Sequence, residues 1–288
     1  KNLFKVLLGK VKKNKNITKF NNQILGFKRS ENEIIINLGS STLSASLLIA
    51  ADGKNSYIRQ KSNIKSFRKK YNQKAFIFNI KHKNSHNNLA IENFLEQGPL
   101  ASLPLNISKT NNYSSIVWSC NHPYYYQFKN NQKNFLEKFL KTNLNKFYGK
   151  VEIVSPINHW DLTLTNSKKY FDYRILLIGD SAHNIHPIAG QGFNLTLRGL
   201  KKFYLIAKNN YNKKGDLGDI KNLVNYNNSH YLDAKLLILA TDKLNLLFSN
   251  NNTGLRFIRK NGIRMFNQGR VFKNIFKNYA SKGKLSLN

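Results

Sequence analysis

The sequence predicts an α/β fold in which a β-rich region is inserted into a larger domain and a helical region follows. Three observations support this prediction. Two apolar runs, 47–51 and 174–179, have the character of strands buried on both faces, and each is followed by an aspartate beside a glycine. Between them, short alternating segments separated by Asn- and Lys-rich turns predict a sheet. From residue 220 onward, apolar residues recur at helical spacing.

The expected elements follow in order along the chain. Residues 2–11 predict a helix, because Leu3, Val6, Leu7 and Val11 fall on one side. Residues 17–48 predict several strands with a hairpin turn near 39–41. The other expected elements are strands at 75–80, 89–95, 101–105, 114–119, 151–153 and 174–179, and helices at 132–147, 190–209, 220–248, 255–266 and 271–279. The expected domains are 1–68 with 161–210, an inserted sheet at 69–160, and a helical end at 211–288.

The charge of the chain is extreme, at +33 over 288 residues. The 38 lysines outnumber 9 arginines and asparagine is abundant, which is what an AT-rich coding sequence produces. A dedicated polyanionic partner is the other interpretation. The spread of charge along the chain favours coding bias, so no specific nucleic acid is expected. Both ends are basic and free of acids, so peripheral contact with an anionic membrane surface is also expected.

The single cysteine, Cys120, excludes a disulfide framework and a cysteine-based zinc site. No apolar run approaches the roughly 18 residues of a membrane span, and no secretory signal is found. These features predict a reducing, cytoplasmic location, with peripheral association on the inner face of the membrane. The chain opens with Lys1 inside a predicted helix, which suggests a fragment.

The most informative segment is RILLIGDSAHNIHPIAGQGFNLTLRG, residues 174–199. Asp180 follows a buried strand at its carboxyl end, where open α/β sheets bind ligands and where a carboxylate can accept hydrogen bonds from hydroxyl groups. Pro187 stiffens the loop that follows, and Gly190 and Gly192 let the backbone approach a flat ligand. The amides that begin the next helix favour negative charge. A flavin meets these requirements with its ribityl hydroxyls and its anionic reduced ring.

The whole string is similar to the second FAD-binding motif of flavoprotein hydroxylases of the para-hydroxybenzoate hydroxylase type. This resemblance implies that Asp180 holds the ribityl chain of FAD and that Pro187 lies beside the flavin ring. It also implies that the backbone of 190–194 faces the pyrimidine end of the ring. The cofactor-binding residues that it implies are Asp180, Pro187, Gly190, Gln191, Gly192 and Asn194.

A second motif, ADGKNSYIR at 51–59, also follows a predicted buried strand. Taken alone, Asp52-Gly53 could be an ordinary turn. The segment resembles the DG motif of the same hydroxylases, and Asp52, Gly53, Ser56 and Arg59 match it. The resemblance implies that Asp52, Gly53 and Arg59 lie near FAD and near the nicotinamide cofactor. The order of the two motifs, with a sheet between them, matches as well.

The resemblance extends to the branch of the family that hydroxylates ubiquinone precursors. Residues 89–118 look like its substrate-domain strands, and 188–198 resemble its version of the second motif. Similarity continues through 226–233, 241–242, 246–250 and Gly262, so it covers nearly the whole chain. The chain departs from the branch at three positions. Thr196 and Gly199 replace its usual Gly and Asp, and His230 replaces its usual Arg.

The GxGxxG unit that opens this family and binds the ADP half of FAD is absent. Gly215 and Gly218 lie in a polar segment with no preceding strand. We therefore expect a para-hydroxybenzoate hydroxylase-like fold without its N-terminal unit, and an FAD affinity that is weak or absent in the chain as given.

The resemblance implies an FAD-dependent monooxygenase that uses NAD(P)H and O2 to hydroxylate the ring of a polyprenylated phenol in ubiquinone biosynthesis. Other proteins of that pathway are expected partners. The cofactor performs the chemistry, so no catalytic side chain is assigned. His183 and His186 could share a metal, but no third ligand has suitable spacing. His159-Trp160-Asp161 is interpreted as the end of a strand rather than as an acid–base pair.

Three alternatives stay open from the sequence. One is a flavoprotein of the same fold that acts on another aromatic or prenyl substrate, including as a reductase. The second is a basic, non-catalytic fragment that binds membrane or nucleic acid. The third is a catalytically inactive fragment whose β-rich domain folds alone. The two flavin motifs favour an enzyme, because a simple binding module needs neither of them.

Overall fold

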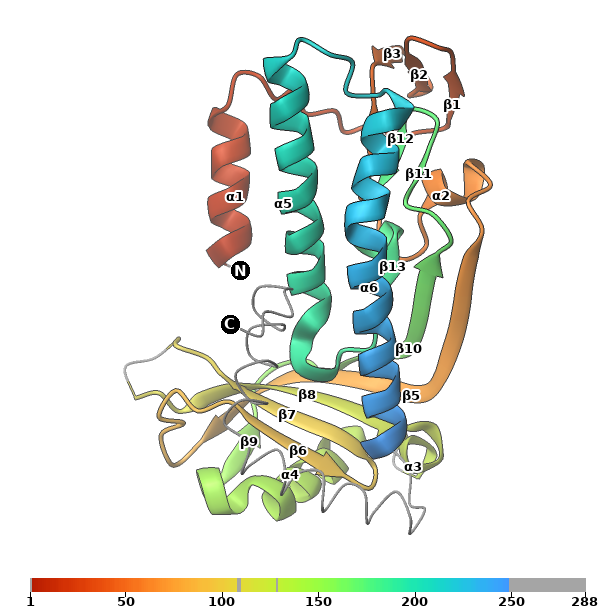
Figure 1. The fold of residues 1–288 in the computed structure, drawn as a ribbon. Coiled ribbons are helices and arrows are strands. Elements are labelled where there is room, and N and C mark those ends of the chain that lie inside the picture. Colours follow the sequence, from red (N-terminus) through yellow and green to blue (C-terminus); the bar gives the residue numbers. More distant parts are fainter. Residues whose placement is uncertain (1, 108–109, 128, 249–288) are drawn as a thin grey trace, which may run out of the picture.

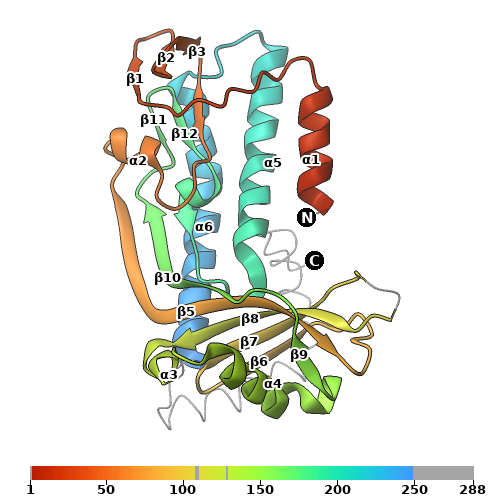
Figure 2. The same ribbon diagram turned by 180° about the vertical axis from the view of Figure 1, so that it is seen from behind.

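The structure is a computed structural model that describes residues 2–107, 110–127 and 129–248 (Figure 1). It has a tall part with long helices and a broad sheet across one end, with a further helix beneath that sheet (Figures 1 and 2). The helices predicted at 255–266 and 271–279 lie outside the described residues. Among the described residues, none of the helices combines the length and the apolar character that crossing a membrane requires.

Two small sheets belong to the tall part. The first is an antiparallel meander of β1 (Gly26–Arg29), β2 (Ile34–Asn37) and β3 (Thr42–Ala45), with the predicted turn between its last two strands. The second has the order β11-β12-β4, from β11 (Phe171–Asp172), β12 (Ile175–Leu177) and β4 (Leu48–Ala50). The strands β12 and β4 are parallel, so their carboxyl ends bring the two motifs to one edge.

One prediction for β4 is wrong. The apolar run 47–51 was expected to be buried on both faces, yet Ile49 is 42% exposed while Leu48 and Ala50 are buried. The reason is that alternate side chains of a strand point to opposite faces, and only the face of β4 that carries Leu48 and Ala50 is covered by described residues. The run at 174–179 meets the expectation, because all three residues of β12 are fully buried.

The large sheet has seven strands in the order β13-β10-β5-β8-β7-β6, and β9 also pairs with β5. Its central strand, β5 (Ser66–His82), is 17 residues long and pairs with β10 at one end and with β8 at the other. The remaining strands are β6 (Ile91–Leu95), β7 (Gly98–Pro104), β8 (Tyr113–Asn121), β9 (Val151–Ile153), β10 (Asn158–Ser167) and β13 (His183–Asn184). The sheet therefore links the flavin-motif segment to the β-rich region.

The helix α4 (Gln132–Tyr148) packs under this sheet because Leu136, Phe139, Leu140 and Leu144 recur at helical spacing. They meet alternate residues of β5, β7 and β8, such as Phe76 and Trp118, in a core of their own. A separate core gathers residues of 34–71, 162–195 and 223–238. The presence of two separate cores is consistent with an inserted sheet. The division of the chain at 68, 160 and 210 remains a prediction.

Two long helices, α5 (Gln191–Asn212) and α6 (Ile220–Phe248), run side by side (Figures 1 and 2). A nearly buried ion pair between Arg198 and Asp233 joins them. The helix α1 (Asn2–Lys13) forms as predicted, but its apolar residues Leu3 and Leu7 are more than half exposed. The short elements are α2 (Tyr57–Lys61), α3 (His122–Tyr126), η1 (Gly179–Ser181) and η2 (Ile188–Gly190).

Candidate active site

A pocket of about 680 Å³ lies where the two motifs meet. The loop after β4 contributes Ala51 and Gly53, and the segment after β12 contributes most of the remaining wall. The lining from that segment consists of Ile178, Gly179, Asp180, Asn184, Ile185, His186, Pro187, Gly190, Gly192, Phe193, Thr196 and Leu200. Two stretches more than 120 residues apart in the sequence therefore form one site.

Asp180 is the carboxylate of this pocket. It lies in η1, directly after the fully buried strand β12. Burial raises the pKa of its carboxyl group above the ordinary value, and the positive charge of Lys54 partly opposes that rise. A hydroxyl-bearing ligand can donate hydrogen bonds to this carboxylate, which would restore the interactions that it lost with water.

The glycines of the second motif leave room for a ligand. Gly190 has a φ of +60° as the N-cap of α5, and no atom lies within 4 Å of the place where its Cβ would be. Gly192 and Phe193, in the first turn of α5, also line the pocket. That turn contains no acidic residue, so the positive end of the helix dipole faces the pocket without a counter-charge of its own. This arrangement suits a flat ligand with negative charge at its edge.

Thr196 fits into this site through two local contacts. Its hydroxyl donates a hydrogen bond of 3.1 Å to the Gly192 carbonyl, one turn earlier in α5. A Cβ at Gly179 would lie 3.3 Å from the Thr196 methyl group, so this side chain fills space against the start of η1. The threonine thus belongs to the lining of the pocket.

The DG motif acts on the site mainly through its backbone. Gly53 has a φ of +81° and open space at its Cβ position. The Asp52 carboxylate accepts a hydrogen bond from the Ile58 amide and so holds the start of α2, which Ser56 caps through the Arg59 amide. Asp52 and Ser56 therefore shape the loop that presents Gly53.

Arg59 joins the two motifs. It is 1% exposed, and its guanidinium donates hydrogen bonds of 2.7 Å to the carbonyl of Ser181, beside Asp180, and to the carbonyl of Lys54. Burial lowers its pKa below the ordinary value, and the nearby charge of Arg68 lowers it further. Arg59 thus links the two walls of the pocket, because it binds a carbonyl group of each motif segment.

The structure gathers five of the nine predicted cofactor-binding residues in the pocket wall. These are Gly53, Asp180, Pro187, Gly190 and Gly192. Asp52 and Arg59 support the wall through the hydrogen bonds just described. Gln191 and Asn194 lie in the first turn of α5 and are partly buried. The cofactor roles of all nine remain predictions.

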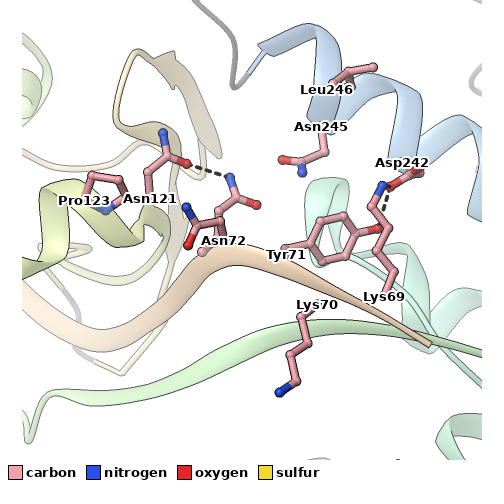
Figure 3. A pocket seen from close by; sticks show the side chains of 10 residues that line it. Lys69, Lys70, Tyr71, Asn72, Asn121, Pro123, Asp242, Asn245 and Leu246 are labelled. Atoms are coloured by element: carbon pink, nitrogen blue, oxygen red, sulfur yellow. Dashed lines mark hydrogen bonds and ion pairs between the residues drawn. The ribbon is translucent and has the colours of Figure 1, made fainter.

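A second pocket, of about 380 Å³, lies between β5, the start of α3 and the end of α6 (Figure 3). Tyr71 and Lys69 both donate hydrogen bonds to the Asp242 carboxylate, at 2.9 and 2.7 Å. Burial and this carboxylate raise the pKa of the Tyr71 hydroxyl well above its ordinary value. The rings of Tyr71 and His186 are nearly perpendicular to each other, with 4.9 Å between their centroids.

His186 connects this second pocket to the first. Its Nδ1 accepts a hydrogen bond from the Ile188 amide, so its Nε2 carries the proton that it donates to the Gln73 side chain at 3.0 Å. Gln73 in turn donates to Asn121 at the end of β8. The sequence motifs include neither Tyr71 nor Gln73, because alternation along a strand does not distinguish these side chains from their neighbours.

His183 has a different partner, His230 of α6. Their Nε2 atoms are 3.2 Å apart, so one ring donates and the other accepts. A Cβ at Gly199 would lie 2.6 Å from the same His230 atom. The two departures at 199 and 230 are therefore neighbours in space, and the glycine makes the room that the second imidazole occupies.

These buried histidines predict a loss of stability in acid. Burial lowers the pKa of His183 and of His186 to about 4, so the unfolded chain binds protons between pH 6.5 and 4 that the folded chain does not bind. The free energy of unfolding should therefore fall as pH falls through this window, by about 2 kcal/mol per histidine between pH 6.5 and 5. Urea denaturation at several pH values measures this slope. The variant His186→Asn should flatten it, and an unchanged slope would contradict the assignment.

A third pocket, of about 330 Å³, lies beside the DG motif and is strongly basic. Arg68 and Lys70 point to the same face of β5, because they are two residues apart along the strand, where they pair with Thr165 and Thr163 of β10. Lys54 extends this group toward Asp180. The pocket lining is Lys54, Asn55, Arg68, Lys69, Lys70, Thr163 and Thr165, and it contains no acidic residue. Such a lining suits a phosphate-bearing ligand.

The structure also describes the two other candidate sites from the sequence, the metal site with its histidine pair and the segment 159–161. In the described part of the chain, no group of three or more His, Cys, Asp or Glu is arranged to hold a metal ion. His159-Trp160-Asp161 was expected to end a strand and instead lies at the start of β10. The Asp161 carboxylate there accepts a hydrogen bond from Lys74 and is 3.3 Å from the ring of His122.

Comparison with known proteins agrees with this geometry. Residues 5–204 match the family model described as an FAD binding domain. The chain is 31% identical over 241 residues to the ubiquinone hydroxylase UbiL of Rhodospirillum rubrum. This alignment covers 83% of the chain and 55% of UbiL. It is 28% identical over 286 residues to the human ubiquinone biosynthesis monooxygenase COQ6, covering 86% of this chain and 59% of COQ6. The chain thus spans somewhat more than half the length of these relatives.

Solved structures show the same fold. The p-nitrophenol 4-monooxygenase PnpA of Pseudomonas putida matches with a TM-score of 0.72 at 13% identity, over 98% of this chain and 71% of PnpA. PqsL of Pseudomonas aeruginosa, a probable FAD-dependent monooxygenase, matches with a TM-score of 0.71 at 17% identity, over 86% of this chain and 70% of PqsL. With the family match over most of its length, the chain belongs to the FAD binding domain family.

Proposed function

We propose that this protein is an FAD-dependent monooxygenase that hydroxylates the aromatic ring of a polyprenylated phenol in ubiquinone biosynthesis, using NAD(P)H and O2. The observation that carries the proposal is the pocket in which Gly53 of one motif faces Asp180 and Gly190 of the other. The names of the relatives, ubiquinone hydroxylase and ubiquinone biosynthesis monooxygenase, support the reaction and the substrate class.

The residues present fit the flavin half of FAD. Asp180 would accept hydrogen bonds from the ribityl hydroxyls, and Pro187 would lie along the ring. The open Cβ position of Gly190 and the first turn of α5 would receive the pyrimidine edge. When bound and reduced, the flavin supplies the activation of O2. The protein orients the ring and excludes water from it, and the buried loop 183–188 suits that task.

The basic pocket beside the DG motif supports NAD(P)H as the reductant. Arg68, Lys70 and Lys54 surround a space that adjoins the loop carrying Gly53, so phosphates bound there would hold a dinucleotide next to the flavin site. Comparing the rates of oxidation of NADPH and NADH tests whether this pocket binds the additional phosphate of NADPH. The basic surface of the chain also supports peripheral contact with an anionic membrane, where a polyprenylated substrate resides.

The decisive experiment is flavin reconstitution followed by turnover. FAD is added to the purified protein, alone and in a form that also carries a nucleotide-binding βαβ unit, and bound flavin is measured by absorbance. NADPH oxidation is then followed with a prenylated phenol and with an unprenylated one, and products are examined by mass spectrometry for one added oxygen. If neither form binds flavin, the proposal fails. If flavin is bound and reduced without an added oxygen, a reductase of the same fold is indicated.

The variant Asp180→Ala should weaken flavin binding by about ten- to a hundredfold, because charge-assisted hydrogen bonds to ribityl hydroxyls are worth about 1.5–3 kcal/mol. Fluorescence quenching of the flavin measures this change. Asp161→Ala is the control, since that carboxylate lies on β10 and is exposed to solvent. Equal affinity in Asp180→Ala and in the unmodified protein would show that this carboxylate does not hold the flavin.

A further inference from the structure

A chain of hydrogen bonds leads from the flavin pocket into the large sheet. The Ile188 amide donates to Nδ1 of His186 at 3.3 Å, and Nε2 of His186 lies 3.0 Å from the side-chain oxygen of Gln73. The Gln73 side-chain nitrogen donates to the Asn121 oxygen at 3.1 Å (Figure 3). Asn121 then donates to the main-chain carbonyl of Glu96, between β6 and β7, at 3.3 Å. These bonds connect the loop after β12 with the turn between two strands of the sheet.

The two ends of this chain fix the direction of every bond in it. A main-chain N–H can only donate, and a main-chain carbonyl can only accept. His186 therefore accepts at Nδ1 and donates from Nε2, and Gln73 accepts from His186 and donates to Asn121. A reversed Gln73 amide would place two donors together at His186 and two acceptors together at Asn121. Only one tautomer of neutral His186 fits, with its proton on Nε2.

Gln73 is buried, where a polar side chain costs stability. It is 3% exposed, and His186 is 1% exposed. Burying an amide is unfavourable unless its hydrogen bonds are satisfied, and an apolar residue of the same size would fill this place in β5 without that requirement. What the amide adds is orientation, because it holds a buried imidazole in one tautomer and one ring position.

The imidazole in turn holds part of the wall of the flavin pocket. His186 and Pro187 both line that pocket, and Ile188, whose amide is bound by Nδ1 of His186, is buried. The ring of Pro187 fixes its own φ, so the direction of this turn depends on the residues on either side of it. If the His186 ring rotated or changed tautomer, it would release the Ile188 amide and with it the position of Pro187.

We infer that Gln73 is a positioning residue of the flavin site, which keeps the proton of His186 on Nε2 and thereby holds Pro187 and Ile188 at the wall of the pocket. This inference rests on the proposed function, since it assigns that pocket to the flavin. Gln73 lines the neighbouring pocket and not the flavin pocket itself, so it acts on the flavin through His186.

The charged groups around His186 leave this role to the glutamine. In the described part of the chain, those that act on the imidazole are Asp242 of α6 and Lys69 of β5, and they pair with each other at 2.7 Å. Tyr71, whose ring is perpendicular to His186, donates its hydroxyl to the same carboxylate. The direct partner of Nε2 is thus the neutral Gln73, and burial lowers the pKa of His186 to about 4.

The first test observes His186 directly, in the chain without flavin. Nitrogen NMR of isotope-labelled histidine reports the charge and the tautomer of each ring, and His186→Asn assigns the signal by its disappearance. The unmodified protein should keep the proton on Nε2 down to about pH 5. In Gln73→Glu a carboxylate becomes the acceptor, so the pKa of His186 should rise from about 4 to between about 5 and 7. In Gln73→Met, which offers no acceptor oxygen, the second tautomer should appear.

The second test measures flavin affinity by fluorescence quenching, in a form of the protein that binds flavin. Gln73→Met should raise the dissociation constant about fivefold or more, because a hydrogen bond worth about 1 kcal/mol is lost. Gln73→Glu keeps the acceptor for His186 and should stay within about twofold of the unmodified protein at pH 8. Below the raised pKa of His186, the imidazolium in Gln73→Glu should also raise the midpoint potential of the bound flavin, since it favours the anionic reduced ring.

Asn79→Asp is the matched control. It makes the same change from amide to carboxylate on the same strand, six residues and about 20 Å from Gln73, and it should alter neither His186 nor flavin affinity. Folding is followed in the same spectra through His183, whose contact with His230 does not involve Gln73.

An unchanged tautomer and pKa of His186 in both folded Gln73 variants, or the same changes in Asn79→Asp, would overturn the inference. Unchanged flavin affinity in Gln73→Met with an altered His186 would also overturn it. An altered His186 in a protein that binds no flavin in any form would instead remove the proposed function, and with it the flavin part of this inference.

Discussion

Replacing Arg59 with methionine is expected to lower the free energy of unfolding by about 3–4 kcal/mol. The guanidinium is buried, and its two hydrogen bonds satisfy the carbonyls of Ser181 and Lys54. Methionine keeps most of the packing volume but leaves both carbonyls without their donor. Urea denaturation followed by far-ultraviolet circular dichroism measures the change. Because the same bonds fix the two walls of the flavin pocket, flavin affinity should fall as well.

The control for this prediction is Arg29→Met. Arg29 also forms an ion pair, with Asp172, but its side chain is 33% exposed and water competes for the interaction. A loss below about 1 kcal/mol is expected there. If Arg59→Met cost no more than Arg29→Met, Arg59 would not be the structural link between the motifs. A direct role toward a bound ligand would then be the better explanation of its place in the DG motif.

Gly199→Asp is expected to destabilise the protein by more than about 3 kcal/mol. The new Cβ would lie 2.6 Å from Nε2 of His230 and 3.0 Å from the Tyr226 hydroxyl, in the buried contact between α5 and α6. The carboxylate would add an unpaired buried charge. Gly9→Asp is the control on another helix, since nothing lies within 4 Å of its Cβ position. It should cost only the small propensity difference between the two residues.

A second substitution should restore part of the stability that Gly199→Asp removes. The sequence resembles hydroxylases that usually carry Asp at 199 and Arg at 230, and the two positions are in contact in this structure. In Gly199→Asp with His230→Arg, a buried ion pair replaces the pair of imidazoles. The double variant should recover more than half of the stability lost by Gly199→Asp, a coupling of about 2 kcal/mol that a double-mutant cycle measures. Additive losses would show that the two positions do not act as a pair.

Local patterns of residues predicted the helices and strands whose buried side chains recur at regular spacing. The helix expected at 132–147 is α4, Gln132–Tyr148, because its four core residues recur every three or four positions. The strand expected at 114–119 lies within β8, Tyr113–Asn121, where every second side chain is fully buried. In both cases periodicity reports directly on which face is covered.

Elements that depend on pairing with distant segments were not predicted from the sequence. The segment 158–167 was not identified as a strand, and its first residues were taken for the end of one. Its pairing with β5 joins residues about 80 to 100 positions apart, and its early side chains are largely exposed, so the apolar signal is weak. Ile49 shows the reverse case. An apolar run predicted burial on both faces, but only one face of β4 is covered in the structure.

The sequence by itself determined the two motifs, because each one encodes its own backbone. The glycines at 53 and 190 have positive φ values that other residues rarely adopt, and an aspartate follows directly on a buried strand. Only the tertiary structure decided which side chains meet. Arg59 reaches a carbonyl 122 residues away, Tyr71 a carboxylate 171 residues away, and His183 an imidazole 47 residues away. Such contacts depend on the distance and direction between whole elements, which no local pattern of residues contains.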